Sequence, residues 1–269
     1  MNAVKKIKAV AISDIGNSRD NNEDNLFLLS DAQVEFIFNE CSESNFVSSS
    51  YLPNSFCCAV SDGMGGHEFG EIASLKVVEY LSVHYDELIK SLDNKELIQN
   101  YVTRINEQFC NFAMRNKNYR NMGATLCGLV TDGKKALCFN VGDSRAYTFC
   151  SGKLKQITVD HSEGQRLFDL QLLTAEELKT FPNRKAIYKY IGQKTTLIPD
   201  IFEIENYSSC SYILLCTDGL TDVLSDDEIE SVLGSTDIDI NRKSQLLIDL
   251  ALKRRLNAGD NITLILIEL

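Results

Sequence analysis

The chain has 269 residues, of which 44% are hydrophobic and 24% are charged, and its formal net charge is −11. These are ordinary values for a soluble globular protein, and an acidic chain with no basic cluster is not typical of a nucleic-acid-binding protein. No stretch approaches the roughly 20 apolar residues needed to span a bilayer, and the N-terminal apolar run is too short for a signal peptide, so we expect no membrane contact and a cytoplasmic location.

Short apolar runs bounded by Gly, Asp and Asn recur along the chain and predict strands. They are Ala9–Ser13, Leu26–Ser30, Phe56–Ser61, Ala124–Val130, Ala136–Val141, Arg145–Phe149, Ile201–Ile204, Tyr212–Cys216 and Ile262–Ile267. Two helical segments separate the third run from the fourth, so the strands come in blocks, which is typical of an α+β protein. No interdomain linker or repeat is visible, and we therefore predict one domain over residues 1–269.

Periodic apolar residues predict three helices. The first runs from Glu71 to about Leu88, and the third from Arg242 to Leu256, ending near Gly259. The second has the clearest stripe, spaced 4-3-4-3 along one helical face: Ile98, Val102, Ile105, Phe109 and Phe112. Asp93 and Glu96 resemble a capping box just before that stripe. We expect these stripes to be core.

Two segments lack these patterns. Asp31–Ser55 is polar and serine-rich and predicts a loop or hairpin insertion, and Asp160–Gln193 predicts a partly helical excursion. Most of the nine cysteines lie in the apolar runs, where a free cysteine behaves as a small buried hydrophobe. Since no C-x-x-C pair occurs, we expect no zinc site. We also expect a reducing environment without disulfides.

Acidic residues gather at the ends of the predicted strands. One carboxylate at a strand end is commonplace, but here the pattern repeats, with Glu23 and Asp24, Asp62, Asp143, Asp218 and Asp260. If these strand ends converge, the like charges repel unless a cation lies between them. Mg²⁺ and Mn²⁺ prefer such oxygen ligands, and Gly63 and Gly219 allow a backbone carbonyl to approach as well.

A pair of such ions suits the hydrolysis of phosphate esters, because two metals about 4 Å apart can hold and activate one water. Arg19 is the candidate for gripping the phosphoryl oxygens, because a guanidinium matches phosphate in a bidentate way. The spacing equally allows Arg19 to form a surface ion pair with Asp14 or Asp20.

Seven segments then form a signature in chain order. They are SDIGNSRDNNED (13–24), AVSDGMGGHEFGEIAS (59–74), MGATL (122–126), NVGDSRAY (140–147), DHS (160–162), CTDGLTD (216–222) and GDNIT (259–263). With these motifs the chain resembles the PP2C-type (PPM) metal-dependent protein serine/threonine phosphatases, in particular their bacterial branch. The resemblance covers nearly the whole chain, and all seven motifs in order are very specific.

The resemblance implies a four-layer α-β-β-α sandwich, with two central antiparallel sheets flanked by helices. It implies that Asp62 bridges two Mn²⁺ or Mg²⁺ ions and that the Gly63 carbonyl binds the second. Asp218 and Asp260 would complete the first ion, and Asp24 the second through water, with Glu23 as a further candidate. Asp143 would hold a third ion together with Asp218. Arg19 would bind the phosphate, and Asn261 would orient Asp260.

A mobile flap beside the site would correspond to about Asp160–Gly192. The chain departs from the family pattern in the longer Asp31–Ser55 segment and at Gln171, where a glycine is common, so an altered turn is expected there. Neither departure touches a metal position. His67 is a candidate general acid, although a local structural role is the more frequent one for such a residue. We expect His161 to brace the base of the flap, and His84 to lie on a helix.

The implied reaction is hydrolysis of phosphoserine and phosphothreonine in proteins by a water held between the ions, without a covalent phosphoenzyme. Two alternatives remain open: a catalytically weak docking module that keeps the fold, and a phosphatase of a small phosphorylated metabolite. The implied partners are phosphoproteins and a cognate Ser/Thr kinase, with no nucleic acid, and the expected state is a monomer.

Overall fold

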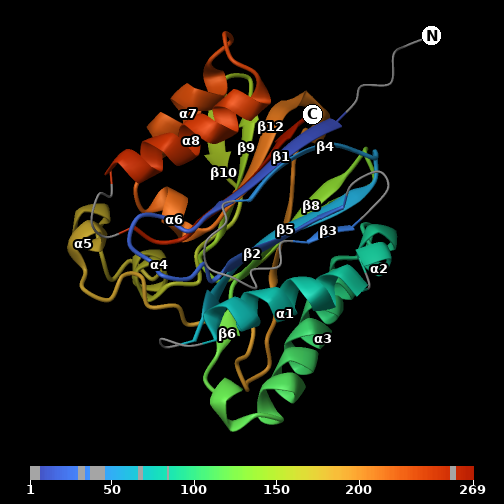
Figure 1. Cartoon of the computed structure of the whole chain (residues 1–269), viewed down its shortest axis with the longest axis vertical. Helices are drawn as coiled ribbons and strands as arrows, with labels where there is room; N and C mark the ends of the chain where they lie inside the picture. The colour runs from blue at the N-terminus through green and yellow to red at the C-terminus, as the bar shows by residue number, and fades with distance from the viewer. Residues whose placement is uncertain (1–6, 30–33, 37–45, 66–68, 84, 255–258) are drawn as a thin grey trace.

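Two antiparallel sheets pack face to face between two layers of helices in the computed structural model, which describes residues 7–29, 34–36, 46–65, 69–83, 85–254 and 259–269 (Figure 1). The expected four-layer sandwich is confirmed. The first sheet has the order β10-β9-β12-β13-β1-β4. Its strands are Lys153–Gln156 (β10), Arg145–Cys150 (β9), Cys210–Cys216 (β12), Ile262–Glu268 (β13), Ile7–Asp14 (β1) and Phe46–Leu52 (β4).

The second sheet has the order β11-β8-β7-β5-β2-β3, and the short β6 also pairs with β5. Its strands are Asp200–Glu203 (β11), Ala136–Val141 (β8), Leu126–Thr131 (β7), Phe56–Met64 (β5), Asp24–Leu29 (β2), Val34–Phe36 (β3) and Gly123–Ala124 (β6). All of these pairings are antiparallel.

Successive side chains of each strand point to opposite faces of its sheet, and this alternation produces three apolar layers. On β2, Leu26 and Leu28 face the other sheet, whereas Phe27 faces the helices, because successive side chains point to opposite faces. The apolar layer between the sheets also receives Ala9 and Ala11 of β1. Every strand near the centre is therefore buried on both faces, which explains why the apolar runs are nearly continuous.

Helices Gly70–Val83 (α1), Tyr85–Lys90 (α2) and Lys95–Met114 (α3) cover the second sheet, and Asp218–Thr221 (α6), Asp226–Gly234 (α7) and Ile240–Arg254 (α8) cover the first (Figure 1). The segment predicted as one helix from Glu71 to Leu88 forms two, α1 and α2. The cap of α3 is Asn94, whose side chain accepts hydrogen bonds from the backbone N–H groups of Glu96 and Leu97. The prediction of Asp93 as the cap was therefore wrong by one residue.

The described part of Asp31–Ser55 contains one strand of each sheet, and the first of them, β3, pairs antiparallel with the preceding strand β2, as in a hairpin. Strand β3 extends the second sheet beside β2, and β4 forms the edge of the first sheet beside β1. The chain therefore crosses from one sheet to the other within this segment. The three consecutive serines Ser48, Ser49 and Ser50 lie in an edge strand whose residues alternate between exposed and partly buried, so their polarity did not exclude a strand. Strand β10 was also missed, because KLKQ carries a single apolar residue.

The expectation of no disulfide was wrong at one pair of cysteines. Cys150 ends β9 and Cys210 begins β12, and the two face each other across neighbouring strands, where they form a disulfide. Cys57, Cys58, Cys127, Cys138 and Cys216 are free and buried, as expected. Among the described residues, no helix is long and apolar enough to cross a membrane.

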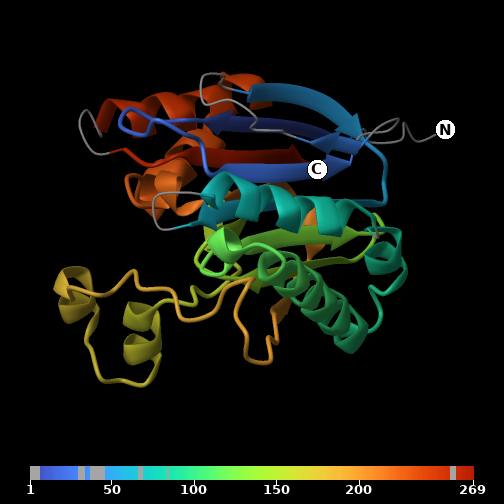
Figure 2. The ribbon, with the colours of Figure 1, turned by 60° about the horizontal axis from the view of Figure 1, so that its bottom comes forward.

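The excursion after β10 forms a flap that projects from the sandwich (Figure 2). It contains two short helices, Glu163–Asp169 (α4) and Ala175–Thr180 (α5), which confirms its partly helical character. Its two legs are joined by backbone hydrogen bonds from Glu163 to Ala186 and from Tyr188 to His161. The returning leg also pairs Ile191 with Ala124 of β6, next to β5.

Candidate metal centre

The strand ends that carry the acidic residues meet at one cleft with a volume of about 600 Å³. Asp62 lies near the end of β5, and its cross-strand partner on β2 is Asp24. Asp218 follows β12 at the start of α6, and Asp260 precedes β13. The two sheets thus supply different members of one cluster. The predicted residues that line the cleft are Arg19, Glu23, Asp62, Gly63, Asp143, Asp218 and Asp260.

In the absence of a cation, the carboxyl groups of this cluster are difficult to ionise. Burial, and then the charge of Asp218, raises the pKa of both Asp24 and Asp143 to about 8. Burial raises the pKa of Asp62 well above its usual value, and Asp24, Asp218 and Asp143 add to the effect. Such groups ionise readily when a divalent cation lies among them, because the cation compensates both desolvation and repulsion.

A bound ion fits this donor set. Oδ1 of Asp143 is buried and has no hydrogen-bond partner among the described residues, as expected for an oxygen that awaits a ligand. All donors are oxygens, which suits Mg²⁺ and Mn²⁺. Within the described part of the chain, however, no three acidic, histidine or cysteine side chains are already arranged around one point. The carboxylates therefore converge on the cleft without forming a closed ligand cage.

Glycines let the loops of the site approach one another closely. A Cβ on Gly63 would collide with the carbonyl of Gly70, at the start of α1. The Asp260–Asn261 backbone lies between two other glycines, because a Cβ on Gly16 would meet the Asp260 carbonyl and a Cβ on Gly219 would meet that of Asn261. Gly16 also has a positive φ of 79°, which favours glycine.

Arg19 forms an ion pair with Asp260, with 2.9 Å between Nη2 and Oδ1. In the described part of the chain it does not pair with Asp14 or Asp20, the partners that the spacing also allowed. The Arg19 side chain is 47% exposed at the mouth of the cleft. The guanidinium therefore neutralises one carboxylate of the cluster while still facing solvent.

Asn261 acts on the Arg19 loop more than on Asp260. Its side-chain Nδ2 donates to the carbonyls of Ile15 (2.8 Å) and Asn21 (3.0 Å), and its Oδ1 accepts from the backbone N–H of Glu23 (2.7 Å). Its own backbone N–H donates to the Asp260 carboxylate at 3.0 Å. One buried amide thus holds the loop that carries Arg19 against the start of β13.

Asp24 and Glu23 differ in accessibility. Asp24 is 1% exposed, and its carboxylate accepts a 2.8 Å hydrogen bond from the hydroxyl of Thr217, on the opposite sheet. Glu23 is half-buried and lines the cleft. Of these two neighbours, Glu23 reaches the cleft surface, and Asp24 lies behind it. Thr217 was not predicted, although it belongs to the CTDGLTD motif.

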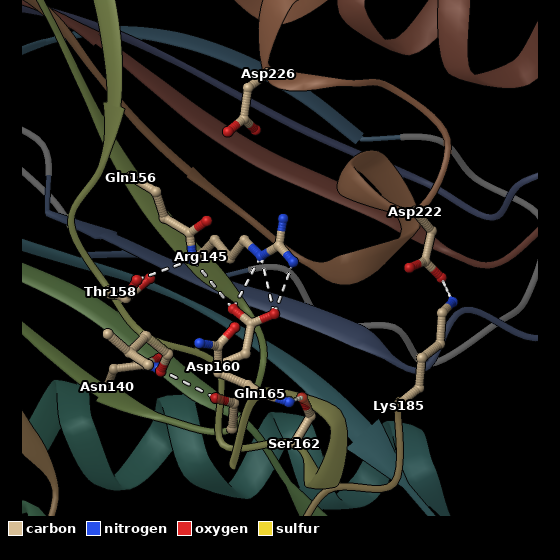
Figure 3. A network of polar contacts seen from close by, with 12 residues as sticks. Asn140, Arg145, Gln156, Thr158, Asp160, Ser162, Gln165, Lys185, Asp222 and Asp226 are labelled. Carbon is tan, nitrogen blue, oxygen red and sulfur yellow. Dashed lines mark hydrogen bonds and ion pairs between the residues drawn. The ribbon is translucent and has the colours of Figure 1, made fainter. Parts of the chain in front are cut away.

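A second pocket of about 300 Å³ lies under the flap and shares Asp143, Lys185 and Asp218 with the cleft. In Figure 3, Arg145 faces Asp160 with two nitrogens, Nε and Nη2, and its Nη2 lies 2.7 Å from Oδ2. Lys185 of the flap reaches Asp222, just after α6. These four residues were not predicted as site residues, although Arg145, Asp160 and Asp222 lie in motifs and Lys185 lies in the segment assigned to the flap.

Of the three histidines, His67 and His84 lie outside the described residues. His161 is buried at the base of the flap, and its backbone carbonyl accepts from Tyr188 on the opposite leg at 3.0 Å. This main-chain contact joins the two legs of the flap, and a bracing role for the His161 side chain stays a prediction.

A family model described as protein phosphatase 2C matches residues 46–251. Protein phosphatase PhpP of Streptococcus pneumoniae is 31% identical over 262 residues, which cover 96% of each chain. Serine/threonine phosphatase stp of Listeria welshimeri is 29% identical over 212 residues, covering 78% of this chain and 82% of the relative.

Solved structures agree with these relatives. Serine/threonine phosphatase Stp1 from Staphylococcus aureus superposes with a TM-score of 0.81 at 32% identity and covers 97% of this chain and 94% of its own. The phosphatase PstP/Ppp of Mycobacterium tuberculosis gives 0.78 at 29% identity, with 98% and 99% coverage. A catalytic domain of PstP in complex with two manganese ions gives 0.71 at 26% identity, with 98% of both chains covered.

Proposed function

Because the chain belongs to the protein phosphatase 2C family and is a metal-dependent protein serine/threonine phosphatase, we propose that the carboxylate cleft is its metal centre. The observation that carries this proposal is the convergence of buried Asp143 with the partly buried Asp62 and Asp218, whose charges are mutually unfavourable without a cation. Asp62, Asp218 and Asp260 would hold one ion, and Asp62 and the Gly63 carbonyl would hold a second.

Glu23 and Asp24 would have different tasks at the second ion. Glu23 faces the cleft, which supports contact with that ion directly or through water. Asp24 is enclosed by the backbone and by Thr217, so its task is to add negative charge behind Asp62. Asp143, with its unpartnered oxygen, would hold a third ion together with Asp218. The ions would be Mn²⁺ or Mg²⁺, which these oxygen donors suit equally well.

Bound ions of this type supply a water activated for attack on phosphorus. The side chains of the chain itself would bind and orient the ester. Arg19, at the mouth of the cleft, would grip two phosphoryl oxygens with its planar fork. Asn261 would keep the Arg19 loop in place through its three backbone contacts. No nucleophilic side chain is needed in this scheme, and no covalent phosphoenzyme would form. The role of His67 as general acid stays a prediction.

The substrates are phosphoproteins, as the named relatives imply. We propose in addition that a cognate Ser/Thr kinase and its targets are among them, and that the chain acts as a cytoplasmic monomer built of one domain over residues 1–269. These proposals rest on the family and on the continuous packing of the sandwich.

The test is release of phosphate from a phosphothreonine peptide with Mn²⁺, comparing wild type and Asp218→Asn. We expect turnover that EDTA abolishes and that falls at least 100-fold in Asp218→Asn, because one ligand of the bridged pair is lost. Asp249→Asn on α8 is the matched control and keeps full activity. Ion binding by calorimetry without turnover in the wild type would favour a docking module, and turnover restricted to small esters would favour a metabolite phosphatase.

A further inference from the structure

The turn between β8 and β9 presents Asp143 to the cleft, and its backbone is held from two sides. On one side, a Cβ on Gly142 would collide with Thr125, whose hydroxyl accepts from the Asp62 N–H at 2.9 Å. Gly142 has a φ of +111°, a conformation that an L side chain rarely adopts. On the other side lies the buried ring of His161.

His161 makes a reciprocal pair with Gly142. The Gly142 N–H donates to Nδ1 of His161 at 2.9 Å, and the His161 N–H donates to the Gly142 carbonyl at 2.9 Å. The side chain of Asn140, labelled in Figure 3, adds a 3.2 Å bond to the same carbonyl. Since Nδ1 is an acceptor here, the ring proton must be on Nε2.

Nε2 lies 3.2 Å from Oδ2 of Asp200, the first residue of β11, in a close charge contact whose geometry is not that of a regular hydrogen bond. The other oxygen of Asp200 accepts from Nζ of Lys189, on the returning leg of the flap, at 2.7 Å. The His161 contact lowers the pKa of Asp200 to about 2, opposed by partial burial and aided by Lys189, so Asp200 is a charged acceptor. A carboxylate behind a histidine fixes both the tautomer and the orientation of the ring.

We propose that Asp200 and His161 are positioning residues for the metal centre: Asp200 holds the His161 ring in the tautomer that accepts the Gly142 N–H, and this contact fixes the turn that carries Asp143. The inference rests on the proposed role of Asp143 as a ligand. Neither residue touches substrate or ion, and Asp200 lies outside every motif of the sequence.

The first test needs no activity. Histidine labelled with ¹⁵N reports by long-range correlation which ring nitrogen carries the proton, and we expect protonated Nε2 and bare Nδ1 for His161 at pH 7. The Gly142 amide proton should move upfield in His161→Ala and stay in place in His161→Asn, because the Asn oxygen can take the position of Nδ1. A wild-type ring protonated at Nδ1 overturns the inference.

The second test measures Mn²⁺ affinity by calorimetry. His161→Ala should weaken the site that uses Asp143 about 10-fold, a typical effect for a group behind a metal ligand. His161→Asn should recover most of this loss, and Asp200→Ala should show a smaller loss. Lys189→Met is the control, since it removes the other partner of Asp200 and should leave the affinity unchanged.

A double-mutant cycle separates positioning from general destabilisation. In an Asp143→Ala background, His161→Ala should have no further effect on Mn²⁺ binding. Equal effects of His161→Ala in both backgrounds, or His161→Asn as weak as His161→Ala, would contradict the proposal. If His161→Ala does not fold, Asp200→Ala and the tautomer decide. Absence of Mn²⁺-dependent turnover in the wild type would count against the proposed function and leave the tautomer test intact.

Discussion

Asp260 takes part in an ion pair and in backbone contacts, and it lies beside the proposed phosphate-binding residue Arg19. Its carboxylate accepts from Arg19 and from the Asn261 N–H, and its carbonyl lies against Gly16. The guanidinium of Arg19 therefore places a positive charge beside the carboxylate cluster. When a phosphoryl group enters the cleft, the exposed guanidinium has to divide its donors between Asp260 and the ester.

This arrangement makes Arg19 a test of phosphate binding. Arg19→Ala should lower kcat/KM for a phosphothreonine peptide about 10- to 100-fold, the value of one or two charge-assisted hydrogen bonds. Arg19→Lys should recover only part of this loss, because an ammonium lacks the planar fork. Initial-rate measurements over a range of peptide concentrations check both variants. Wild-type kcat/KM in Arg19→Ala would exclude the role.

Lys243 is a buried lysine that stabilises the end of a neighbouring helix. The side chain lies on α8, its residue is 1% exposed, and its Nζ donates to the carbonyls of Val232 (3.2 Å), Leu233 (2.7 Å) and Ser235 at the end of α7. These are carbonyls that a helix end leaves without an intrahelical partner.

Lys243→Met should therefore lower the free energy of unfolding by about 2 kcal/mol, since buried carbonyls lose their donors. Lys253→Met, on the exposed face of the same helix, is the control and should change it by less than about 0.5 kcal/mol. Urea unfolding followed by circular dichroism measures both. An unchanged midpoint in Lys243→Met would show that water replaces the ammonium.

At the scale of elements, the strongest sequence signals were apolar runs and stripes, and these located most central strands and the three long helical regions. What they missed depends on distant partners. Strand β4 is serine-rich, and only its pairing with β1 makes it a strand. The Cys150–Cys210 pair requires the β9–β12 neighbour relation, which spacing does not reveal.

The metal-centre residues were found through motifs, because carboxylates at the ends of predicted strands indicate where negative charges come together. Their burial was not predictable. Asp24 and Glu23 are adjacent in sequence, yet Asp24 lies behind the cleft and Glu23 lines it, because successive residues entering β2 point in different directions. The pairing of Lys185 with Asp222 depends on how the flap folds back, and no local pattern encodes that.

Gln171, which stands where the family pattern commonly has a glycine, ends helix α4 in the left-handed region. It follows α4 with a φ of +59°, its N–H donates to the Phe168 carbonyl (2.8 Å), and the Leu172 N–H donates to that of Leu167 (2.9 Å). This is the left-handed C-terminal cap in which glycine is preferred. Gln171 thus adopts the backbone conformation that glycine favours, and the expected effect on the turn stays a prediction.

Gln171→Gly should stabilise this turn by up to about 1 kcal/mol, because a side chain is disfavoured in the left-handed region. Gln171→Ala keeps the Cβ and should give no such gain. Amide hydrogen exchange in α4 measures the difference, as slower exchange in the glycine variant alone. Equal exchange in all three proteins would show that the cap carries no strain.

At the scale of the molecule, both sheets contribute to one acidic cluster, so metal content and stability are linked. Asp24 and Asp143 have pKa values of about 8 in the folded protein, far above those of an unfolded chain. Between about pH 4 and pH 8, the folded metal-free protein therefore binds more protons than the unfolded one. The contribution of these two groups to the stability of the metal-free protein therefore falls as the pH rises through this range.

Thermal unfolding in EDTA should accordingly show a midpoint that decreases from pH 5 to pH 8, by roughly 2 °C for each kcal/mol lost in a chain of this size. Mn²⁺ should flatten or reverse the trend, because its ligands bind as deprotonated groups. Asp24→Asn should reduce the dependence seen in EDTA. A midpoint in EDTA that rises towards pH 8 would contradict the proton linkage.

The paired base of the flap, here called its neck, has a consequence for how far the outer part of the flap can vary among relatives. The two legs are tied to each other by backbone bonds at Glu163–Ala186, Gly164–Arg184 and His161–Tyr188, so the register of the neck does not depend on the side chains beyond it. The outer part of the flap can therefore change in length and composition while the sandwich stays the same. Grafting residues 165–183 from one relative into another should transfer peptide preference as a unit, leaving the hydrolytic machinery of the recipient in place.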